Sequence, residues 1–168
     1  AMLDEASTAV QVCGACNAVR KEADGRLVGD MFDGQGFVRG LARKGRPARG
    51  SSALVIGSGG VGSAIAVAMA EAGVGRLALY DTRSEVMEQL ASRLQQFFPT
   101  LPIQLGSNDP NGFEIVVNAT PMGMEPGDPL PIDVNRISPT AMVGEVVMKQ
   151  EETPLLSAAQ AKGCLTQI

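Results

Sequence analysis

Hydrophobic positions change their spacing along the chain, and each spacing predicts a different element. ALVIG (53–57) is a continuous apolar run bounded by glycine, as expected for a parallel strand buried on both faces. SAIAVAMAEAG (63–73) is apolar nearly all round, which predicts a buried helix ending at Gly73. Residues 84–98 carry apolar side chains at helical spacing, with Ser84 as a candidate N-cap.

Shorter apolar runs complete this pattern. They predict strands at 76–81, 102–106, 114–120 and 141–148, and one more that starts at 165–168. A helix is expected over 152–164, with Thr153 or Glu152 near its start and Gly163 at its end. Strands that alternate with helices predict the α/β class and an open, doubly wound parallel sheet.

The first part of the chain has a different pattern. ACNAVRK (15–21) and RLVGD (26–30) are β-leaning runs joined by EADG, and Asp-Gly is a strong turn signal, so a hairpin is predicted. From Asp33 the apolar residues recur at helical spacing over 34–44. RPARGSS (46–52) is typical of a basic linker. The chain is therefore expected to divide into residues 1–32, 33–52 and 53–168.

The composition narrows the classes of function. The 168 residues are 45% apolar and 19% charged, which suits a packed core, and the net charge of −4 argues against nucleic acid as a partner. No apolar run approaches the ~20 residues that cross a bilayer, and the first residues lack a signal-peptide pattern. We therefore expect a cytoplasmic protein with no membrane partner.

The sequence contains no histidine, which excludes Ser-His-Asp and Cys-His hydrolases and HExxH metalloproteases. Proton transfer would fall to Asp, Glu, Lys or Cys, or to a group outside this chain.

The cysteines leave a second interpretation open. Cys13 and Cys16 form C-x-x-C, which suits a redox or metal site, and Cys164 stands apart. A second metal-ligating pair is missing, so no metal is expected. A thioredoxin-type motif opens a helix after a strand, whereas CGAC precedes a strand-like run. Two small residues in a packed segment are therefore the favoured interpretation.

A glycine-rich turn follows the first buried strand. LVIGSGGVGSAIA contains G-x-G-x-x-G between a predicted strand and a predicted helix, the context in which this motif binds a dinucleotide. Gly57 permits the tight turn, Gly59 lets the backbone approach a pyrophosphate, and Gly62 lets the helix pack against the strand. The fold is therefore expected to be of the Rossmann type. The cofactor-binding residues expected in this turn are Gly57, Ser58, Gly59, Gly60, Val61 and Gly62.

Asp81 ends the second strand of this unit, 24 residues after Gly57. An acid at that place accepts hydrogen bonds from the adenosine ribose and repels the extra phosphate of NADP. Arg83, in Asp81-Thr82-Arg83, is able to turn towards a 2′-phosphate. Because the carboxylate cannot move away, NAD is favoured over NADP.

With these motifs in place, the chain resembles the shikimate/quinate dehydrogenase family along nearly its whole length. GACNAV (14–19) is similar to the segment whose asparagine binds the substrate's ring hydroxyls, a role that falls on Asn17. GDMFDGQGF (29–37) resembles the segment whose aspartate forms a catalytic dyad with a lysine, a role that falls on Asp33. VVNATPMGM is similar to the stretch beside the nicotinamide, which implies cofactor contacts at Asn118, Ala119, Thr120, Met122, Gly123 and Met124.

The departures from the family pattern concern the substrate. Met31 and Phe32 replace Asn-Thr before the aspartate, Met148 stands at the place of a substrate-binding tyrosine, and Glu145 stands at that of an aspartate. These residues make the site more apolar than shikimate, a triol carboxylate, requires. The resemblance implies hydride transfer between a nicotinamide and the ring alcohol of shikimate, quinate or a related cyclic hydroxy acid such as aminoshikimate.

The resemblance also implies that part of the enzyme lies outside this chain. Members of the family begin with an α/β substrate domain that holds the catalytic lysine, and residues 1–32 look like the last strands of such a domain. Residues 33–52 would then be a connecting helix and linker, and 53–168 the dinucleotide-binding domain. The chain alone is expected to bind dinucleotide without turnover, as a monomer or homodimer. Two alternatives stay open: a non-catalytic dinucleotide-binding regulatory module, and Asp33 as only a helix N-cap.

Overall fold

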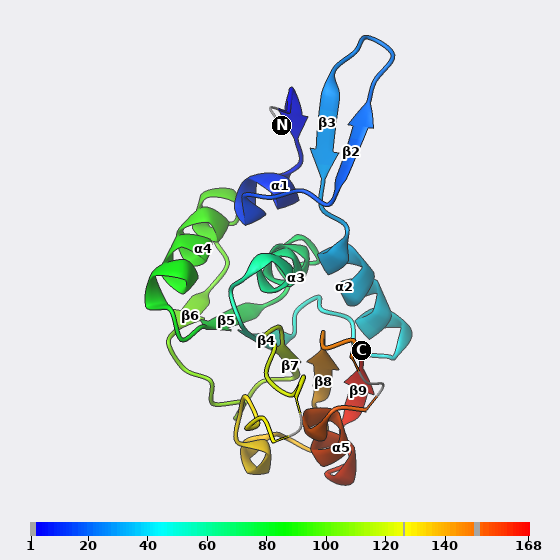
Figure 1. The fold of residues 1–168 in the computed structure, drawn as a ribbon. Coiled ribbons are helices and arrows are strands. Elements are labelled where there is room, and N and C mark those ends of the chain that lie inside the picture. The colour runs from blue at the N-terminus through cyan, green and yellow to red at the C-terminus, as the bar shows by residue number, and fades with distance from the viewer. Residues whose placement is uncertain (1–2, 126, 150–151) are drawn as a thin grey trace.

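The computed structural model describes residues 3–125, 127–149 and 152–168, which form two β-sheets and their covering helices (Figure 1). The elements begin with β1 (Glu5–Ala6), α1 (Thr8–Cys13), β2 (Ala18–Lys21), β3 (Leu27–Asp30) and α2 (Asp33–Arg43). They continue with β4 (Ser52–Ile56), α3 (Gly60–Glu71), β5 (Arg76–Tyr80), α4 (Ser84–Phe97) and β6 (Ile103–Leu105). The last are β7 (Ile115–Asn118), the 3₁₀ helix η1 (Val134–Arg136), β8 (Met142–Glu145), α5 (Pro154–Ala161) and β9 (Leu165–Gln167).

The larger sheet has six strands in the order β6-β5-β4-β7-β8-β9, and every neighbouring pair is parallel. The predicted doubly wound parallel sheet is therefore confirmed. From β4 the chain adds β5 and β6 on one side of β4. It then returns to the other side of β4 and adds β7, β8 and β9. Ligands of such sheets bind at this reversal, beyond the carboxyl ends of the strands. In this molecule that place lies where Ile56 and Asn118 pair.

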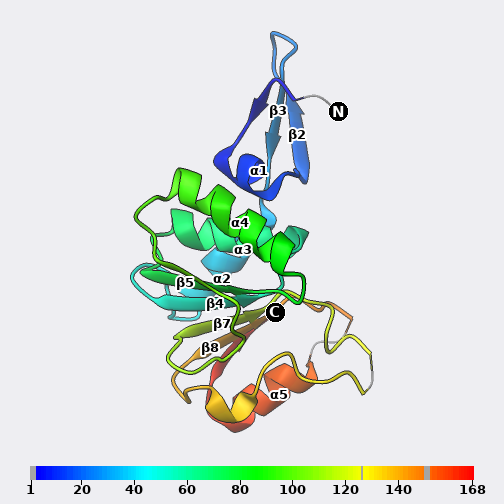
Figure 2. The same ribbon diagram turned by 90° about the vertical axis from the view of Figure 1, so that its left-hand side faces the viewer.

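Helices cover both faces of this sheet. Figure 2 shows α2, α3 and α4 on one side and α5 on the other. Alternate residues of β4 enter the two cores: Val55 packs with the first group of helices, whereas Leu54 and Ile56 pack with α5. Burial on both faces explains why this strand is apolar at every position, as the sequence pattern predicted.

Two glycines allow helices to approach other backbone closely. A Cβ at Gly34 of α2 would lie 1.8 Å from the carbonyl oxygen of Ala64 in α3. A Cβ at Gly62 of α3 would lie 1.9 Å from the carbonyl oxygen of Gly57 at the end of β4. Helix α2 is thus fixed backbone to backbone on α3, and α3 on the turn before it. The predicted packing role of Gly62 is confirmed.

The helix starts differ from the predictions in two places. Helix α3 begins at Gly60, three residues before the predicted start, because glycines carry no side chain that would contribute to an apolar pattern. The predicted Ser84 cap is wrong: Ser84 is the first residue of α4, and no side chain caps that helix. Thr153 does cap α5, since its side chain accepts a hydrogen bond from the Leu156 amide.

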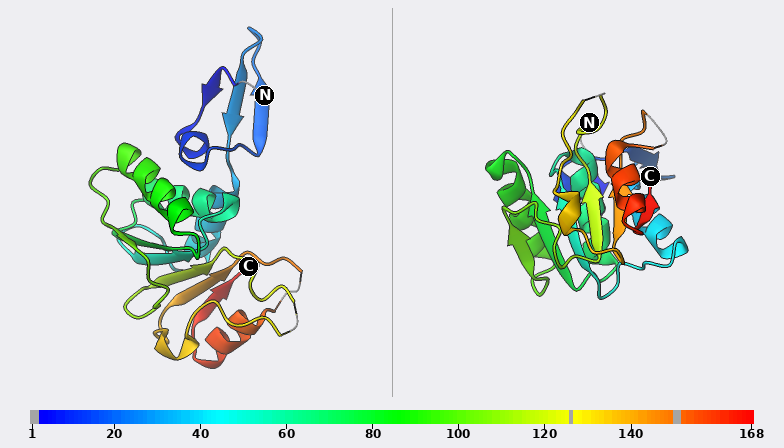
Figure 3. Two further views of the ribbon diagram at one scale, coloured as in Figure 1. Left: turned by 60° about the vertical axis from the view of Figure 1, so that its left-hand side comes forward. Right: turned by 90° about the horizontal axis from the view of Figure 1, so that it is seen from below.

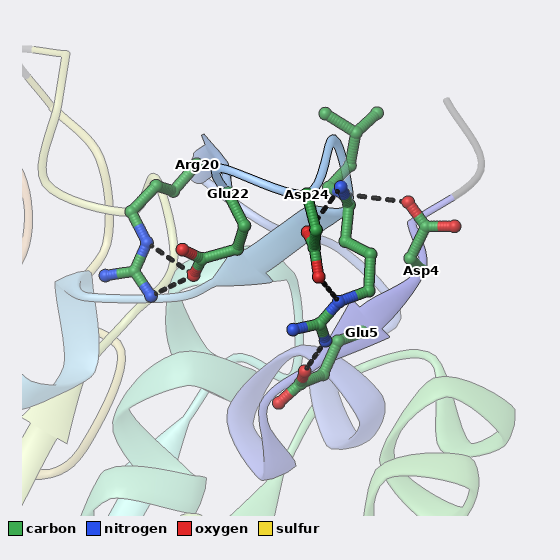
Figure 4. A network of polar contacts seen from close by, with 7 residues as sticks. Asp4, Glu5, Arg20, Glu22 and Asp24 are labelled. Carbon is green, nitrogen blue, oxygen red and sulfur yellow. Dashed lines mark hydrogen bonds and ion pairs between the residues drawn. The ribbon is translucent and has the colours of Figure 1, made fainter.

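The smaller sheet has the order β1-β3-β2. The predicted hairpin is confirmed as antiparallel β2 and β3, but β1, parallel to β3, and α1 were not predicted. The exposed ion pair Arg26–Glu5 links the hairpin to β1, and two others lie within the hairpin (Figure 4); pairs of this kind contribute little stability. Helix α1 joins this sheet to the rest of the molecule by burying Ala9, Val10 and Val12 in the core shared with α3 and α4.

The hairpin projects away from the helical layer, and the end of β9 lies at the edge of the large sheet (Figure 3). The division into residues 1–32, 33–52 and 53–168 stays a prediction. Within the part of the chain that the structure describes, no helix is both long and apolar enough to cross a membrane.

Candidate functional site

The glycine turn after β4 has the geometry that its sequence predicts. Gly57 has a φ of +98°, and its amide donates to the carbonyl of Tyr80 at 2.7 Å. A Cβ at Gly57 would lie 2.7 Å from the carbonyl oxygen of Ala119, so neither the backbone angle nor the space admits a side chain. The turn therefore holds the ends of β4, β5 and β7 close together.

The outer part of the turn is open. Among the described residues, apart from their own chain neighbours, nothing would contact a Cβ at Gly59 or Gly60, and no described side chain caps the N-terminus of α3. The Ser58 hydroxyl is buried and has no hydrogen-bond partner among the described residues. An uncapped helix N-terminus with bare backbone in front of it is an anion site, so these residues fit the diphosphate of a dinucleotide.

Asp81 lies directly after β5 and faces this turn. Its Oδ2 accepts a hydrogen bond from the Ser58 amide at 2.8 Å, and its Oδ1 accepts one from the Arg83 amide at 2.9 Å. Burial raises the pKa of Asp81, but the hydrogen bonds from these two amides and from the Arg83 guanidinium outweigh it, so the pKa lies below its usual value. An ionised, fixed carboxylate is what the ribose role requires.

A cavity of about 500 Å³ opens at the carboxyl ends of β4, β5 and β7, and we call it the turn cavity. The predicted cofactor residues that line it are Gly57, Gly59, Asp81, Thr82, Arg83, Ala119, Thr120 and Met122. Its other lining residues were not predicted: Ile56, Tyr80, Asn108, Pro121, Leu130 and Pro131. The loop wall around Leu130 carries no motif that the sequence could have revealed.

Asn118, predicted to contact the cofactor, is fully buried at the end of β7. Its Oδ1 accepts from the amide and hydroxyl of Thr120, and its Nδ2 donates to the Met122 carbonyl and to Glu145. The side chain thus holds the loop that lines the turn cavity and does not face the cavity itself.

The other predicted residues of this loop and turn lie outside the lining of the turn cavity. Gly123 is buried, with its amide donating to Asp128, and Met124 is exposed. Gly60 and Val61 form the exposed first turn of α3.

A second cavity, of about 700 Å³, lies between α2, the start of α3 and the ends of β8 and β9, and we call it the α2 cavity. Its lining includes Asp33, Phe37, Val61, Glu145, Val146 and Met148. The two residues with predicted catalytic and substrate roles, Asp33 and Met148, therefore share one cavity. Val61 of the glycine turn also lines it, so the turn borders both cavities.

Asp33 pairs with the other predicted substrate residue. The Asn17 Nδ2 donates to Asp33 Oδ1 at 2.6 Å, and the Asn17 Oδ1 accepts from the Phe32 amide at 3.1 Å. Asp33 is the first residue of α2 and does not cap it, because the N-cap position is Phe32 and no side chain caps this helix. The alternative that Asp33 is only an N-cap is therefore wrong.

The apolar replacements beside Asp33 lie in different surroundings. Met31 is 6% exposed and packs in the main core, so it places neither a polar group nor apolar surface on the substrate side. Phe32 is 50% exposed and Met148 is 88% exposed. Of these three replacements, only Phe32 and Met148 present apolar surface to the outside, and Met148 lines the α2 cavity.

Three of the four lysines make contacts away from Asp33, and Lys21 is exposed at the end of β2, beside the hairpin turn. Lys44 borders the α2 cavity, but it follows the far end of α2, roughly 16 Å along the helix from Asp33 at about 1.5 Å per residue. Its Nζ donates to the Thr166 carbonyl, that of Lys149 pairs with Glu125, and that of Lys162 donates to backbone carbonyls. That the catalytic lysine lies outside this chain stays a prediction.

The cysteines do not form a reactive pair. Cys13 ends α1, and burial raises the pKa of its thiol to about 11. Cys16 is exposed, and Cys164 is buried on the far side of the large sheet. Since a reactive thiol needs a lowered pKa, the geometry gives the redox interpretation no support.

No known family model matches the chain. The shikimate dehydrogenase (NADP⁺) of Rhodospirillum rubrum is 35% identical to it, over 99% of this chain and 61% of that protein. The quinate/shikimate dehydrogenase (NAD⁺) of Corynebacterium glutamicum is also 35% identical, over 98% of this chain and 60% of that protein. Shikimate 5-dehydrogenase from Listeria monocytogenes, solved with shikimate and NAD, superposes with a TM-score of 0.89 at 29% identity, covering 98% of this chain and 61% of that one. The chain spans about 60% of the length of these relatives.

Proposed function

Because the chain belongs to the shikimate/quinate dehydrogenase family, we propose that it supplies the dinucleotide-binding part of an NAD(P)-dependent oxidoreductase. The reaction is hydride transfer between a nicotinamide and the ring alcohol or ketone of shikimate, quinate or a related cyclic hydroxy acid.

The observation that carries this proposal is the position of the glycine turn between two cavities. On one side Gly57, Gly59 and Asp81 line the turn cavity, where a dinucleotide fits. On the other side Val61 lines the α2 cavity together with Asp33. A cofactor seated on the turn is thus next to an acid that is able to bind a substrate hydroxyl.

The residues of this chain have distinct roles in the proposal. A bound nicotinamide supplies the hydride acceptor or donor. Asp33 accepts a hydrogen bond from the reacting hydroxyl, and Asn17 holds the carboxylate in place through its 2.6 Å contact. The partner lysine that the resemblance implies lies outside this chain. Asp33 and that lysine would exchange the proton of the alcohol.

We propose NAD as the preferred cofactor. Asp81 is ionised and fixed by two backbone amides, and the Arg83 guanidinium is drawn towards the same carboxylate, with 3.4 Å between Nε and Oδ1. An arginine engaged in this way is less available for the 2′-phosphate of NADP.

The substrate is proposed to be a cyclic hydroxy acid that presents an apolar edge to Phe32 and Met148, because neither side chain is able to accept or donate a strong hydrogen bond. Shikimate, quinate and aminoshikimate are the compounds to test first. The cytoplasmic location and the monomeric or homodimeric state stay predictions.

A non-catalytic dinucleotide-binding module is the second candidate. Its support was the apolar surroundings of Asp33, and the burial of Met31 removes part of that support. The exposed Met148 still favours it.

Calorimetric titration of the protein with NAD and with NADP tests the cofactor role, and binding of neither would contradict the proposal. In the full-length enzyme, Asp33→Asn is expected to lower turnover by about 10²–10⁴-fold and to leave cofactor affinity nearly unchanged. If Asp33→Asn instead loses cofactor affinity but keeps its turnover at saturating cofactor, Asp33 has no part in the proton transfer.

A further inference from the structure

Glu145 is a buried carboxylate that none of the roles above uses. It is the last residue of β8, lies opposite Asn118 of β7, and is 1% exposed. An ionised carboxylate is tolerated in such a place only when its oxygens are well hydrogen-bonded.

The donors to Glu145 come from three segments. Oε1 accepts from the amides of Val146 and Val147 at 3.1 and 3.3 Å. Oε2 accepts from the Thr153 hydroxyl at 3.2 Å, and the Asn118 Nδ2 donates to both oxygens at 3.0 and 3.2 Å. Burial raises the pKa of Glu145, and these four donors act in the opposite direction.

One arm of this network reaches the loop after β7. Because Asn118 is held by Glu145, its Oδ1 is directed to the amide and hydroxyl of Thr120. The Thr120 hydroxyl in turn accepts from the Met122 amide at 3.1 Å. Thr120 and Met122 line the turn cavity.

The other arm reaches the segment after β8. The Val147 amide donates to Glu145, and the Val146 amide is shared between Glu145 and the Asn118 carbonyl, so the carboxylate holds the segment just after the strand end. Val146 and Met148 line the α2 cavity. Thr153 ties the start of α5 to the same carboxylate. Glu145 is therefore the group that the walls of both cavities share.

We propose that Glu145 is a positioning residue: its carboxylate sets the loop after β7 relative to the strand end after β8, and so fixes the two walls between which a nicotinamide would lie. The proposal rests on the dinucleotide-binding function proposed above. It assigns no direct contact between Glu145 and a ligand.

Glu145→Gln is the sharpest variant, because it keeps the size of the side chain and replaces one acceptor oxygen with an N–H donor. Oε1 and Oε2 both accept from donors, so in either orientation the NH₂ group of the glutamine would face another donor and no acceptor. Glu145→Asp keeps a carboxylate and removes one methylene. Glu88→Gln, at an exposed position of α4, is the matched control for the loss of one charge.

Two measurements test the proposal. In Glu145→Gln, NMR hydrogen exchange without cofactor should be about tenfold faster at the amides of Thr120, Met122 and Val147, while the amides of α3 stay unchanged. The Kd for NAD should rise about tenfold, the effect of a buried donor left without an acceptor. Glu145→Asp should lie closer to the wild type in both measurements, and Glu88→Gln should match it.

Unchanged exchange together with a Kd within about twofold of the wild type in Glu145→Gln would overturn the proposal. So would tighter NAD binding by Glu145→Gln than by Glu145→Asp, since the carboxylate would then not be the group that matters. If Glu145→Gln does not fold, Glu145→Asp is compared with Glu88→Gln instead. Faster exchange and weaker NAD binding in Glu145→Asp support the proposal, and equal values in the two variants overturn it. Wild-type protein that binds neither dinucleotide would contradict the proposed function instead, and the exchange comparison without cofactor would still decide the role of Glu145.

Discussion

Asp81 gives the most direct test of how this protein chooses its cofactor. In Asp81→Asn the side chain keeps its shape and loses its charge. Like charges about 4 Å apart repel by about 1 kcal/mol in water and about 4 kcal/mol near a protein surface, so removal of the charge should favour NADP over NAD by an amount in that range. At 1.4 kcal/mol per tenfold, the affinity ratio should move by at least about fivefold.

The loss of NAD affinity itself follows from the hydrogen bonds. The carboxylate accepts from the Ser58 amide at 2.8 Å and from the Arg83 amide at 2.9 Å, and an asparagine has only one oxygen for these two donors. The neutral side chain is then also a weaker acceptor for the ribose hydroxyls; loss of a charge-assisted bond to the ribose costs about 1.5–3 kcal/mol, so NAD should bind about 10- to 100-fold more weakly.

Calorimetric titrations with NAD and NADP at low salt provide the assay, because screening reduces the charge effect at high salt. Glu85→Gln, an exposed acid in the first turn of α4, removes one charge nearby without touching the turn cavity and is the control. Because the pKa of Asp81 lies below its usual value, the affinity of the wild type for NAD, which has no 2′-phosphate to titrate, should not change between pH 8 and pH 5. An NAD-to-NADP ratio that is the same in Asp81→Asn and the wild type would refute the reasoning.

Two further predictions concern packing and the thiols. Gly34→Ala should lower the free energy of unfolding by about 1–3 kcal/mol, because its Cβ would meet a backbone carbonyl of α3. Gly36→Ala is the control, since a Cβ has open space there. Thermal melting of the two variants checks this, and equal melting temperatures would contradict it. At pH 8 a thiol with a pKa of about 11 is only about one-thousandth ionised, so Cys13 should react slowly with iodoacetamide, and faster as the pH rises. The exposed Cys16 should react first. Peptide mapping checks the order, and equal rates would show that Cys13 is not shielded.

The parts of the site that depend on local physics were predictable from the sequence. The glycine turn is set by the positive φ of Gly57 and by the space that Gly62 leaves, and both follow from a motif six residues long. Asp81 is fixed by its place at the end of a strand next to β4. The boundaries of β4 were predicted to within one residue, whereas the strand predicted over 141–148 runs three residues past the end of β8, because the apolar run continues beyond the strand.

Contacts between distant segments were not predictable in the same way. That Asp33 binds Asn17 instead of capping α2 depends on how the hairpin meets the helix. Met31 looked like a neighbour of the substrate because it precedes Asp33, yet it packs into the core. Helix α1 was missed because six residues are too few for a period, although Ser7 and Gly14 at its ends are ordinary cap residues that could have revealed it.

The direct backbone contact of α2 with α3 has a mechanical consequence. Asp33 sits beside Gly34, which is pressed against α3, so this acid belongs to the same rigid body as the glycine turn. The hairpin that carries Asn17 reaches that body through the short segment around Met31 and through α1. A shift of the small sheet relative to α2 would therefore change the Asn17–Asp33 hydrogen bond but not the distance from Asp33 to the glycine turn.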